Sequence, residues 1–211
     1  MATQTPARQR RRGHDPESVL SIAVGVFNER GYDGTSMEDL ARALGVTKSA
    51  IYYHVPGKEQ LLSRALDRAL DGLFAMVADP RAGSGPAIDR LEYVVRQSVR
   101  ILIDRLPYVT LLLRVRGNSA TEQAALERRR DFDRFVSQLV KEAAAEGGIR
   151  ADVDPALVTR LLFGAVNSIT EWYQPARGAS AEDLSDALLK MLFNGLRAQP
   201  SRPGDGTGPE N

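Results

Sequence analysis

Cysteine is absent from the 211-residue sequence, and the only histidines are His14 and His54. The absence of cysteine excludes disulfides, thiolate metal ligands and a cysteine nucleophile, and two histidines argue against a multi-histidine metal site. No apolar run is long enough to cross a bilayer, because the richest ones are short and interrupted, such as 111–113, which Arg114 follows directly. Residues 1–14 lack the apolar core of a secretory signal. We therefore expect a cytoplasmic protein without a metal, a cofactor or a membrane contact.

An excess of one charge is also missing, since 28 Lys and Arg residues face 27 Asp and Glu residues and the formal net charge is +1. This balance argues against a generally basic surface. The distribution is uneven, because residues 1–14 include Arg8, Arg10, Arg11 and Arg12 but no acidic residue. Such a disordered arm is either a solubilising tail or a segment that settles on DNA. Residues 199–211 are rich in Pro and Gly without periodicity, which predicts a disordered tail.

Apolar residues recur at helical spacing through almost all of the chain between these tails. A first helix of roughly 15 residues ends at Gly31, and short helices are expected at 37–44 and 48–54, with Ser36 and Thr47 as N-caps. Longer helices are expected at 59–77, 87–106, 108–115, 122–146, 155–173 and 181–197. No segment alternates as a strand would. The sequence predicts an all-α protein with a small module at 15–58 and a larger helical domain at 59–198.

The segment 37–54 has the outline of a helix-turn-helix, whose second helix enters the major groove of DNA. Gly45 suits the tight turn because glycine tolerates a positive φ. If Ala50 and Ile51 pack inward, the polar side chains of this helix face outward: Thr47, Lys48, Ser49 and Tyr53, with Tyr52 and His54 reaching the flanking DNA backbone. Thr35 and Ser36 are expected to offer free N–H groups and a hydroxyl at the start of one helix, and Lys58 lies at the start of the next helix. Helix N-termini attract phosphate, so both places are candidate contacts to the DNA backbone.

The same pattern has plainer interpretations. Many helical hairpins turn at a glycine, Tyr52 or Tyr53 could be a half-buried core aromatic, and His54 could brace the turn. Taken alone, these residues leave the choice open.

The run 27–62 resembles the DNA-binding domain of the TetR family of bacterial transcriptional regulators. The residues that match the family pattern in spacing are Phe27, Gly31, Tyr32, Thr35, Ser36, Leu40, Ala41, Gly45, Val46, Thr47, Ile51, Tyr52, His54, Lys58 and Leu62. The sequence departs at Val55, where the family usually has Phe, and at Ser49, where Gly is common. The resemblance implies a repressor that binds a double-stranded DNA operator. It assigns base recognition to Thr47, Lys48, Ser49 and Tyr53, and phosphate contacts to Thr35, Ser36, Tyr52, His54 and Lys58.

The larger domain offers a dimerisation surface and a candidate pocket. Its last two long helices carry apolar stripes at Leu157, Leu161, Leu162, Ala165 and Ile169, and at Leu184, Ala187, Leu188, Met191 and Leu192. Two such helices from each of two chains make a four-helix bundle, so we expect a homodimer, although part of each stripe also faces the chain's own core. The middle helices carry apolar side chains that either line a ligand cavity or fill a core: Leu73, Phe74, Val77, Val94, Val95, Val99, Leu102, Ile103, Phe132, Val136 and Leu139.

Segments 110–133 and 164–175 resemble those of TetR members that respond to acyl-CoA thioesters. The resemblance implies a small-molecule effector with Asn167 and Trp172 as polar groups of its pocket. It also implies arginine partners for the CoA phosphates: Arg114, Arg116, Arg128, Arg129 and Arg130. The same charges suit a solvated helix face, and a regulator of efflux or of another pathway would take a different hydrophobic effector. Effector binding would lower DNA affinity by a coupling free energy of typically ~1–3 kcal/mol, through the helix that starts near Lys58.

An enzyme and a protein-binding helical adaptor are the alternatives from other classes. An enzyme would use His54 with an Asp or Glu, or the cluster at 171–173. The sequence contains no pairing of nucleophile and base, no phosphate-binding loop and no metal-ligand spacing, so we predict that the protein is not an enzyme. An adaptor would leave the arginine-rich arm and the tyrosines of the recognition helix unexplained.

Overall fold

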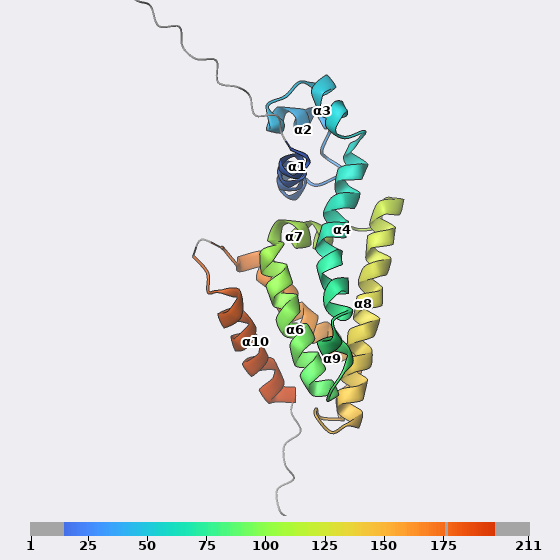
Figure 1. Cartoon of the computed structure of the whole chain (residues 1–211), viewed down its shortest axis with the longest axis vertical. Coiled ribbons are helices and arrows are strands. Elements are labelled where there is room, and N and C mark those ends of the chain that lie inside the picture. Colours follow the sequence, from blue (N-terminus) through green and yellow to red (C-terminus); the bar gives the residue numbers. More distant parts are fainter. Residues whose placement is uncertain (1–14, 176, 197–211) are drawn as a thin grey trace, which may run out of the picture. The chain divides into compact units, whose positions relative to one another are not determined.

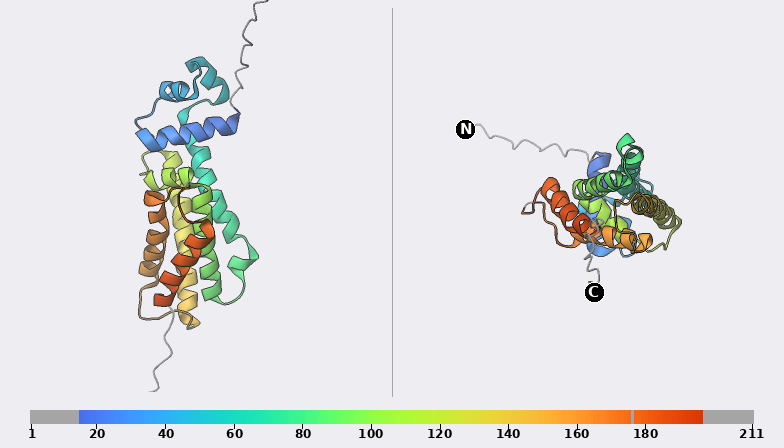
Figure 2. Two further views of the ribbon diagram at one scale, coloured as in Figure 1. Left: turned by 90° about the vertical axis from the view of Figure 1, so that its left-hand side faces the viewer. Right: turned by 90° about the horizontal axis from the view of Figure 1, so that it is seen from below.

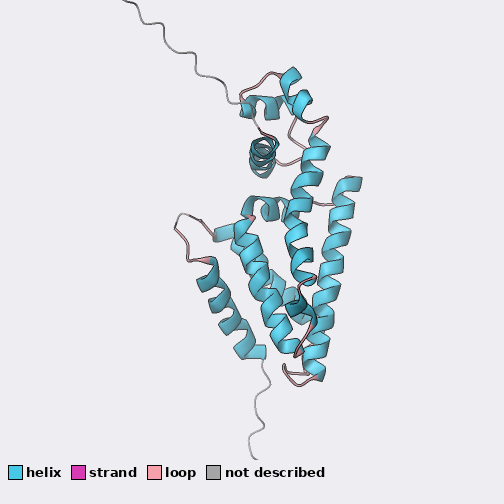
Figure 3. Ribbon diagram, viewed as in Figure 1, coloured by secondary structure: helices cyan, strands magenta, loops and turns pink. Residues whose placement is uncertain are grey.

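The computed structural model describes residues 15–175 and 177–196. These residues form helices and no strand (Figure 3), which confirms the all-α prediction. The predicted arm at 1–14, the tail at 199–211 and the side chain of His54 lie outside the described residues. Within the described ranges, no helix combines the length and apolar character that a bilayer span requires. The helices in Figure 1 are α1 (Pro16–Arg30), α2 (Met37–Leu44), α3 (Lys48–His54), α4 (Lys58–Val77), α5 (Pro80–Gly83), α6 (Ala87–Asp104), α7 (Leu106–Arg114), α8 (Ala120–Ala145), α9 (Pro155–Trp172) and α10 (Ala181–Leu196).

The chain divides into two compact units, of which the first ends at Ala65 and the second begins at Leu66. The boundary falls inside α4, so this helix contributes its first turns to unit 1 and the rest to unit 2. The domain boundary predicted after Lys58 lies at the start of the same helix.

Local caps define the short helices of unit 1. Ser36 and Asp39 form a capping box at the start of α2, and the Thr47 hydroxyl accepts the backbone N–H of Ala50 at the start of α3 (3.2 Å). Gly45 ends α2 in the left-handed conformation, with φ 65° and ψ 29°, which glycine adopts without strain. Both predicted N-caps and the predicted glycine turn are confirmed.

The core of unit 1 is formed by the inward faces of α1, α2, α3 and the first turns of α4. Its fully buried apolar side chains include Val19, Leu20, Phe27, Leu40, Ile51, Leu61 and Leu62. Val55, at the position where the family usually has Phe, is also buried. Burying one such leucine or isoleucine contributes about 1.5–3 kcal/mol, so the smaller side chain at 55 still adds to the core.

In unit 2, α6 packs against α8, α9 and α10 (Figure 2). The buried face of α6 consists of Ala87, Leu91, Val94, Val95, Ser98, Val99 and Leu102. Phe132 of α8 meets Phe163 of α9 edge to face, with ring centroids 5.2 Å apart, which is a favoured aromatic geometry. This aromatic pair contributes to the wall of a cavity described below.

Two details of unit 2 differ from the sequence prediction. The segment predicted as a break after α4 contains the short helix α5, capped by Asp79, whose carboxylate accepts the N–H of Arg81 at 2.9 Å. Pro107, predicted as a break, lies in the first turn of α7. Proline is tolerated there because a first-turn N–H has no partner within the helix.

Candidate functional site

Helix α3 turns one apolar face to the core of unit 1 and one polar face to solvent. Ile51 is fully buried, whereas Tyr53 is 90% exposed and Tyr52 is 47% exposed. Thr47, Lys48 and Ser49, which were also predicted to face outward, are exposed. We call Thr47, Lys48, Ser49 and Tyr53 the recognition surface. It presents hydroxyl and ammonium donors together, a chemistry that suits phosphate oxygens and base edges.

The donors of Thr35 and Ser36, which precede α2, are already occupied. Thr35 is buried, its N–H donates to the carbonyl of Tyr32 (3.2 Å) and its hydroxyl donates to the carbonyl of Gly31 (2.7 Å). The N–H and the hydroxyl of Ser36 both donate to the carboxylate of Asp39, at 3.0 and 2.6 Å. The prediction of free N–H groups at Thr35 and Ser36 is therefore wrong, because the loop and the capping box use these donors internally.

Lys58 binds the loop that precedes α2. Its Nζ lies 3.0, 3.4 and 2.9 Å from the carbonyl oxygens of Tyr32, Asp33 and Thr35 and 4.5 Å from the centroid of the Tyr32 ring. An ammonium group has three hydrogens to donate, and each has an acceptor here. We call this arrangement the lysine clamp. A phosphate contact by Lys58, as the family resemblance implies, would have to compete with these bonds.

Two further cations of unit 1 are held by one carboxylate. Arg30 and Arg42 each place a guanidinium nitrogen 3.1 Å from Oδ1 of Asp39. Hydrogen bonds from Ser36, and then the charges of the two arginines, hold the pKa of the Asp39 carboxyl below its ordinary value. Both arginine side chains remain more than half exposed, so they add positive charge to the surface of unit 1. The sequence analysis did not single them out.

Unit 2 contains an apolar cavity of about 50 Å³, which we call the inner cavity. Of the residues predicted to line a pocket, Leu73, Leu102, Phe132 and Asn167 line it, and so does Arg129, which was predicted as a partner for a CoA phosphate. The other lining residues are Ala69, Ser98, Ile101, Val109, Leu112, Leu113, Asp133, Phe163 and Val166. In the described ranges, no cluster of His, Cys, Asp and Glu could hold a metal ion. The lining of the inner cavity consists of apolar walls and a few polar side chains.

The remaining predicted pocket residues lie elsewhere. Val95, Val99 and Val136 are fully buried in the core, whereas Phe74 and Val77 are half-buried and pack against it. Trp172 is 57% exposed and packs edge to face on Tyr173, with ring centroids 6.4 Å apart. The exposed Arg114 and Arg116 line neither the inner cavity nor the one described next. Helical periodicity identified inward faces without showing which side chains border a void.

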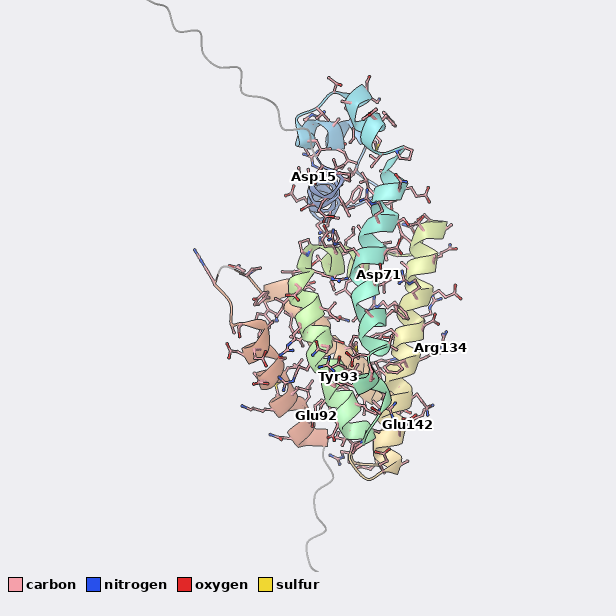
Figure 4. All side chains as sticks on the ribbon, viewed as in Figure 1. Asp15, Asp71, Glu92, Tyr93, Arg134 and Glu142 are labelled. Carbon is pink, nitrogen blue, oxygen red and sulfur yellow. The ribbon has the colours of Figure 1, made fainter. Side chains whose placement is uncertain are left out.

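A second cavity, of about 400 Å³, lies between α8 and α9, and we call it the outer cavity. Its walls are more polar and consist of Arg129, Asp133, Arg134, Ser137, Ala156, Thr159, Arg160, Phe163, Gly164 and Asn167. Figure 4 shows Arg134 on α8. Four residues (Arg129, Asp133, Phe163 and Asn167) line both cavities and form what we call the junction. Arg160, Phe163 and Asn167 follow one another at three- and four-residue spacing, so this face of α9 was recognisable from the sequence once Asn167 was singled out.

One carboxylate of the junction is electrostatically perturbed. Although Asp133 reaches solvent, the cavity walls withdraw its carboxylate from water, and this desolvation raises its pKa above the ordinary value. The Arg129 guanidinium one turn away opposes the shift. The ionised form of Asp133 is therefore already disfavoured, and a second negative charge at the junction would be disfavoured further by repulsion from it.

Comparison with known proteins agrees with this two-unit organisation. Residues 19–65 match the family model for bacterial regulatory proteins of the tetR family, and residues 84–196 match the model for the Tetracyclin repressor-like C-terminal domain. The transcriptional repressor KstR2 of Mycolicibacterium smegmatis is 25% identical over 199 residues, covering 93% of this chain and 96% of that protein.

Two solved structures are also similar. SCO3833, a TetR-family regulator from Streptomyces coelicolor A3, is 57% identical with a TM-score of 0.81, over 88% of this chain and 94% of that one. AibR, solved in complex with isovaleryl coenzyme A and operator DNA, is 27% identical with a TM-score of 0.70, over 84% of this chain and 97% of that one.

Proposed function

The chain belongs to the TetR family of transcriptional regulators, and we propose that it is a homodimeric repressor that leaves its DNA operator when a small effector fills the cavities of unit 2. As a family member it is a transcriptional regulator with an N-terminal helix-turn-helix domain, and not an enzyme. The operator, the effector and the dimer are the parts that we propose.

The observation that carries the proposal is the polarity of α3. The same seven-residue helix buries Ile51 completely and leaves Tyr53 90% exposed beside Thr47, Lys48 and Ser49. A folding role alone gives no reason to expose a large aromatic side chain among polar donors. On DNA, one good base contact from this surface would contribute roughly 1–3 kcal/mol of discrimination between sequences.

A homodimer is supported by apolar side chains that unit 2 leaves uncovered. Leu157 and Leu161 of α9 are 52% and 64% exposed, and Met191 of α10 is 67% exposed. Leu162 and Ile169 of α9 are buried in the chain's own core, so different faces of this helix serve different purposes. A second copy packed on the exposed faces would complete a four-helix bundle and pair two recognition helices for two half-sites about 34 Å apart.

The effector is proposed to be an amphiphile. The inner cavity has apolar walls, and the structural neighbour AibR binds isovaleryl coenzyme A, which supports an acyl-CoA thioester as the ligand class. A different hydrophobic effector, such as a substrate of an efflux system, is the second candidate. Helix α4 carries both Lys58 of the lysine clamp and Ala69 and Leu73 of the inner cavity, so ligand binding would act on DNA binding through this helix.

An electrophoretic mobility-shift assay on the DNA upstream of the protein's own gene tests the DNA-binding surface. We expect Lys48→Ala and Tyr53→Ala each to weaken binding, by about five- to a hundredfold if one base or phosphate contact is lost. Lys141→Ala, which removes an exposed lysine from α8, is the control and should bind as the wild type does. Unchanged binding by both α3 variants would show that the recognition surface is wrongly assigned.

A further inference from the structure

The outer cavity concentrates positive charge. Arg129, Arg134 and Arg160 all line it, together with the hydroxyl residues Ser137 and Thr159. Ala156 and Thr159 lie in the first turns of α9, which begins at Pro155. The N-terminus of this 18-residue helix is capped by the Asp154 carboxylate, which accepts the N–H of Leu157 at 2.8 Å, so the positive charge of the cavity comes from the three guanidinium groups.

These arginines differ in the ion pairs and hydrogen bonds that they already form within the protein. Arg134 is paired with Asp131 on the same helix, and Arg129 interacts electrostatically with Asp133. Arg160, by contrast, has no ion pair and no hydrogen bond to any described part of the chain. Its guanidinium group keeps its full capacity for a bidentate contact with a phosphate or carboxylate.

Four of the five arginines that the family resemblance associated with CoA phosphates line neither cavity. Arg128 donates to the carboxylates of Asp67 and Asp71, each at 2.8 Å, and its guanidinium lies 5.2 Å from the Phe74 ring centroid. Arg114 and Arg116 line neither cavity. Of the five arginines, only Arg129 borders the two cavities.

We propose that the outer cavity is an anion subsite, in which Arg160, supported by Arg129 and Arg134, binds the phosphorylated head group of an effector whose short apolar chain enters the inner cavity through the junction. The proposal rests on the proposed function and adds to it the place where the phosphorylated head group binds and the residues that bind it. A nucleotide thioester and a lysophospholipid share this chemistry, because both join an acyl chain to phosphate.

The junction gives the same site a means to reject free acids. A short-chain carboxylate seated in the inner cavity would bring its charge to the junction, next to Asp133 and Arg129, where desolvation already disfavours a carboxylate in spite of the arginine. A thioester or ester carbonyl at that point is neutral, and its phosphates lie further out, among the arginines. Repulsion between like charges in a partly dehydrated site disfavours only the free acid.

Isothermal titration calorimetry on the full-length protein without DNA tests the subsite. The probes are hexanoyl-CoA, hexanoyl-glycerol 3-phosphate, free CoA and hexanoate. Wild-type protein is expected to bind at least one of the two phosphorylated acyl probes about tenfold or more tightly than hexanoate, and whichever binds identifies the source of the head group. Arg160→Gln should lower that affinity about tenfold and leave hexanoate unaffected. Asp133→Asn should strengthen the binding of hexanoate and not that of the phosphorylated probe.

The matched control is Lys141→Gln, which removes one positive charge from an exposed position of α8 outside both cavities. It should bind every probe as the wild type does, and circular dichroism should give all variants the same helix content. Equal losses for phosphorylated and free acyl probes in Arg160→Gln would overturn the proposal. So would a loss in Lys141→Gln as large as that in Arg160→Gln, or the absence of binding of every acyl probe to the folded wild type.

A mobility-shift assay with the same probes separates this proposal from the proposed function. If the phosphorylated probe binds through Arg160 but leaves the DNA complex intact, the subsite stands and the effector-release function fails. If the probe releases DNA equally from the wild type and from Arg160→Gln, the function stands and the subsite fails.

Discussion

A lysine at position 58 can contact a DNA phosphate or hold the loop that precedes α2, and the surroundings of Lys58 favour the second role. The lysine clamp gives its ammonium group three carbonyl acceptors and an aromatic face. Lys58→Met would remove these bonds, so the partly buried carbonyl of Thr35 would lose the ammonium donor, while that of Tyr32 would keep only the N–H of Thr35 among the bonds described above. We expect the free energy of unfolding to fall by about 1–3 kcal/mol, measured by urea denaturation followed by circular dichroism.

The salt dependence of DNA binding distinguishes the clamp from a phosphate contact. Each phosphate contact that is lost lowers the slope of log K against log salt concentration by about 0.9. Lys58→Met should bind more weakly with an unchanged slope, whereas Lys48→Ala, which removes a positive charge from the recognition surface, should show the reduced slope at unchanged stability. A wild-type unfolding curve combined with a reduced slope in Lys58→Met would mean that Lys58 contacts DNA instead.

Residue-level prediction from the sequence succeeded where a side chain's direction follows from helical phase alone. The 3.6-residue period put Ile51 inside and Tyr53 outside, as the structure has them. It could not foresee that Lys58 would meet carbonyls some 25 positions earlier in the chain. It also could not separate Leu102, which borders the inner cavity, from Val99, which is buried in the core, because voids depend on how several helices meet.

At the scale of elements, the capping box of α2 links helix stability to pH. Hydrogen bonds from Ser36, and then the charges of Arg30 and Arg42, lower the pKa of Asp39 from its ordinary 3.8. A depressed carboxyl pKa stabilises the folded state above the ordinary value, and this stabilisation is lost as pH falls through the lowered pKa. Asp39→Asn should therefore be less stable than the wild type at neutral pH, and the difference should shrink in the acidic range below about 3.8.

Thermal denaturation of wild type and Asp39→Asn between pH 2.5 and 7 measures this effect. Glu38→Gln, at the exposed neighbouring position in the same first turn, is the control and should not reproduce the pH-dependent difference. A stability gap that stays constant across the whole range would assign the effect to packing and not to the ionised carboxylate.

Element boundaries were predictable wherever the sequence contains a local stop or start signal. The predicted ranges of α2 and α3 match because Ser36, Gly45 and Thr47 are strong caps or terminators. The four-residue α5 escaped prediction because it contains Pro, two small residues and no apolar period. Its geometry instead depends on the Asp79 cap and on the packing of Ala82, which is fully buried.

At the scale of the whole molecule, the uncovered apolar side chains of α9 and α10 give the proposed dimer a direct test. Leu157 and Leu161 are four residues apart, so they share one face of α9, and both are more than half exposed. Leu161→Glu would place a charge in the centre of a buried interface while leaving the chain's own core untouched. We expect wild-type protein to sediment as a dimer and Leu161→Glu as a folded monomer whose affinity for a two-half-site operator falls by about a hundredfold or more.

Ala124→Glu introduces the same charge at an exposed position of α8 and should leave both the sedimentation coefficient and DNA binding unchanged.

A dimer reads two half-sites, so shortening the operator gives a second test of dimerisation. If the operator is cut to one half-site, the wild type should lose the affinity that two coupled recognition helices supply and should then bind no better than Leu161→Glu. A wild type that sediments as a monomer at every concentration, or a Leu161→Glu variant that remains a dimer, would rule out this face as the seam between subunits.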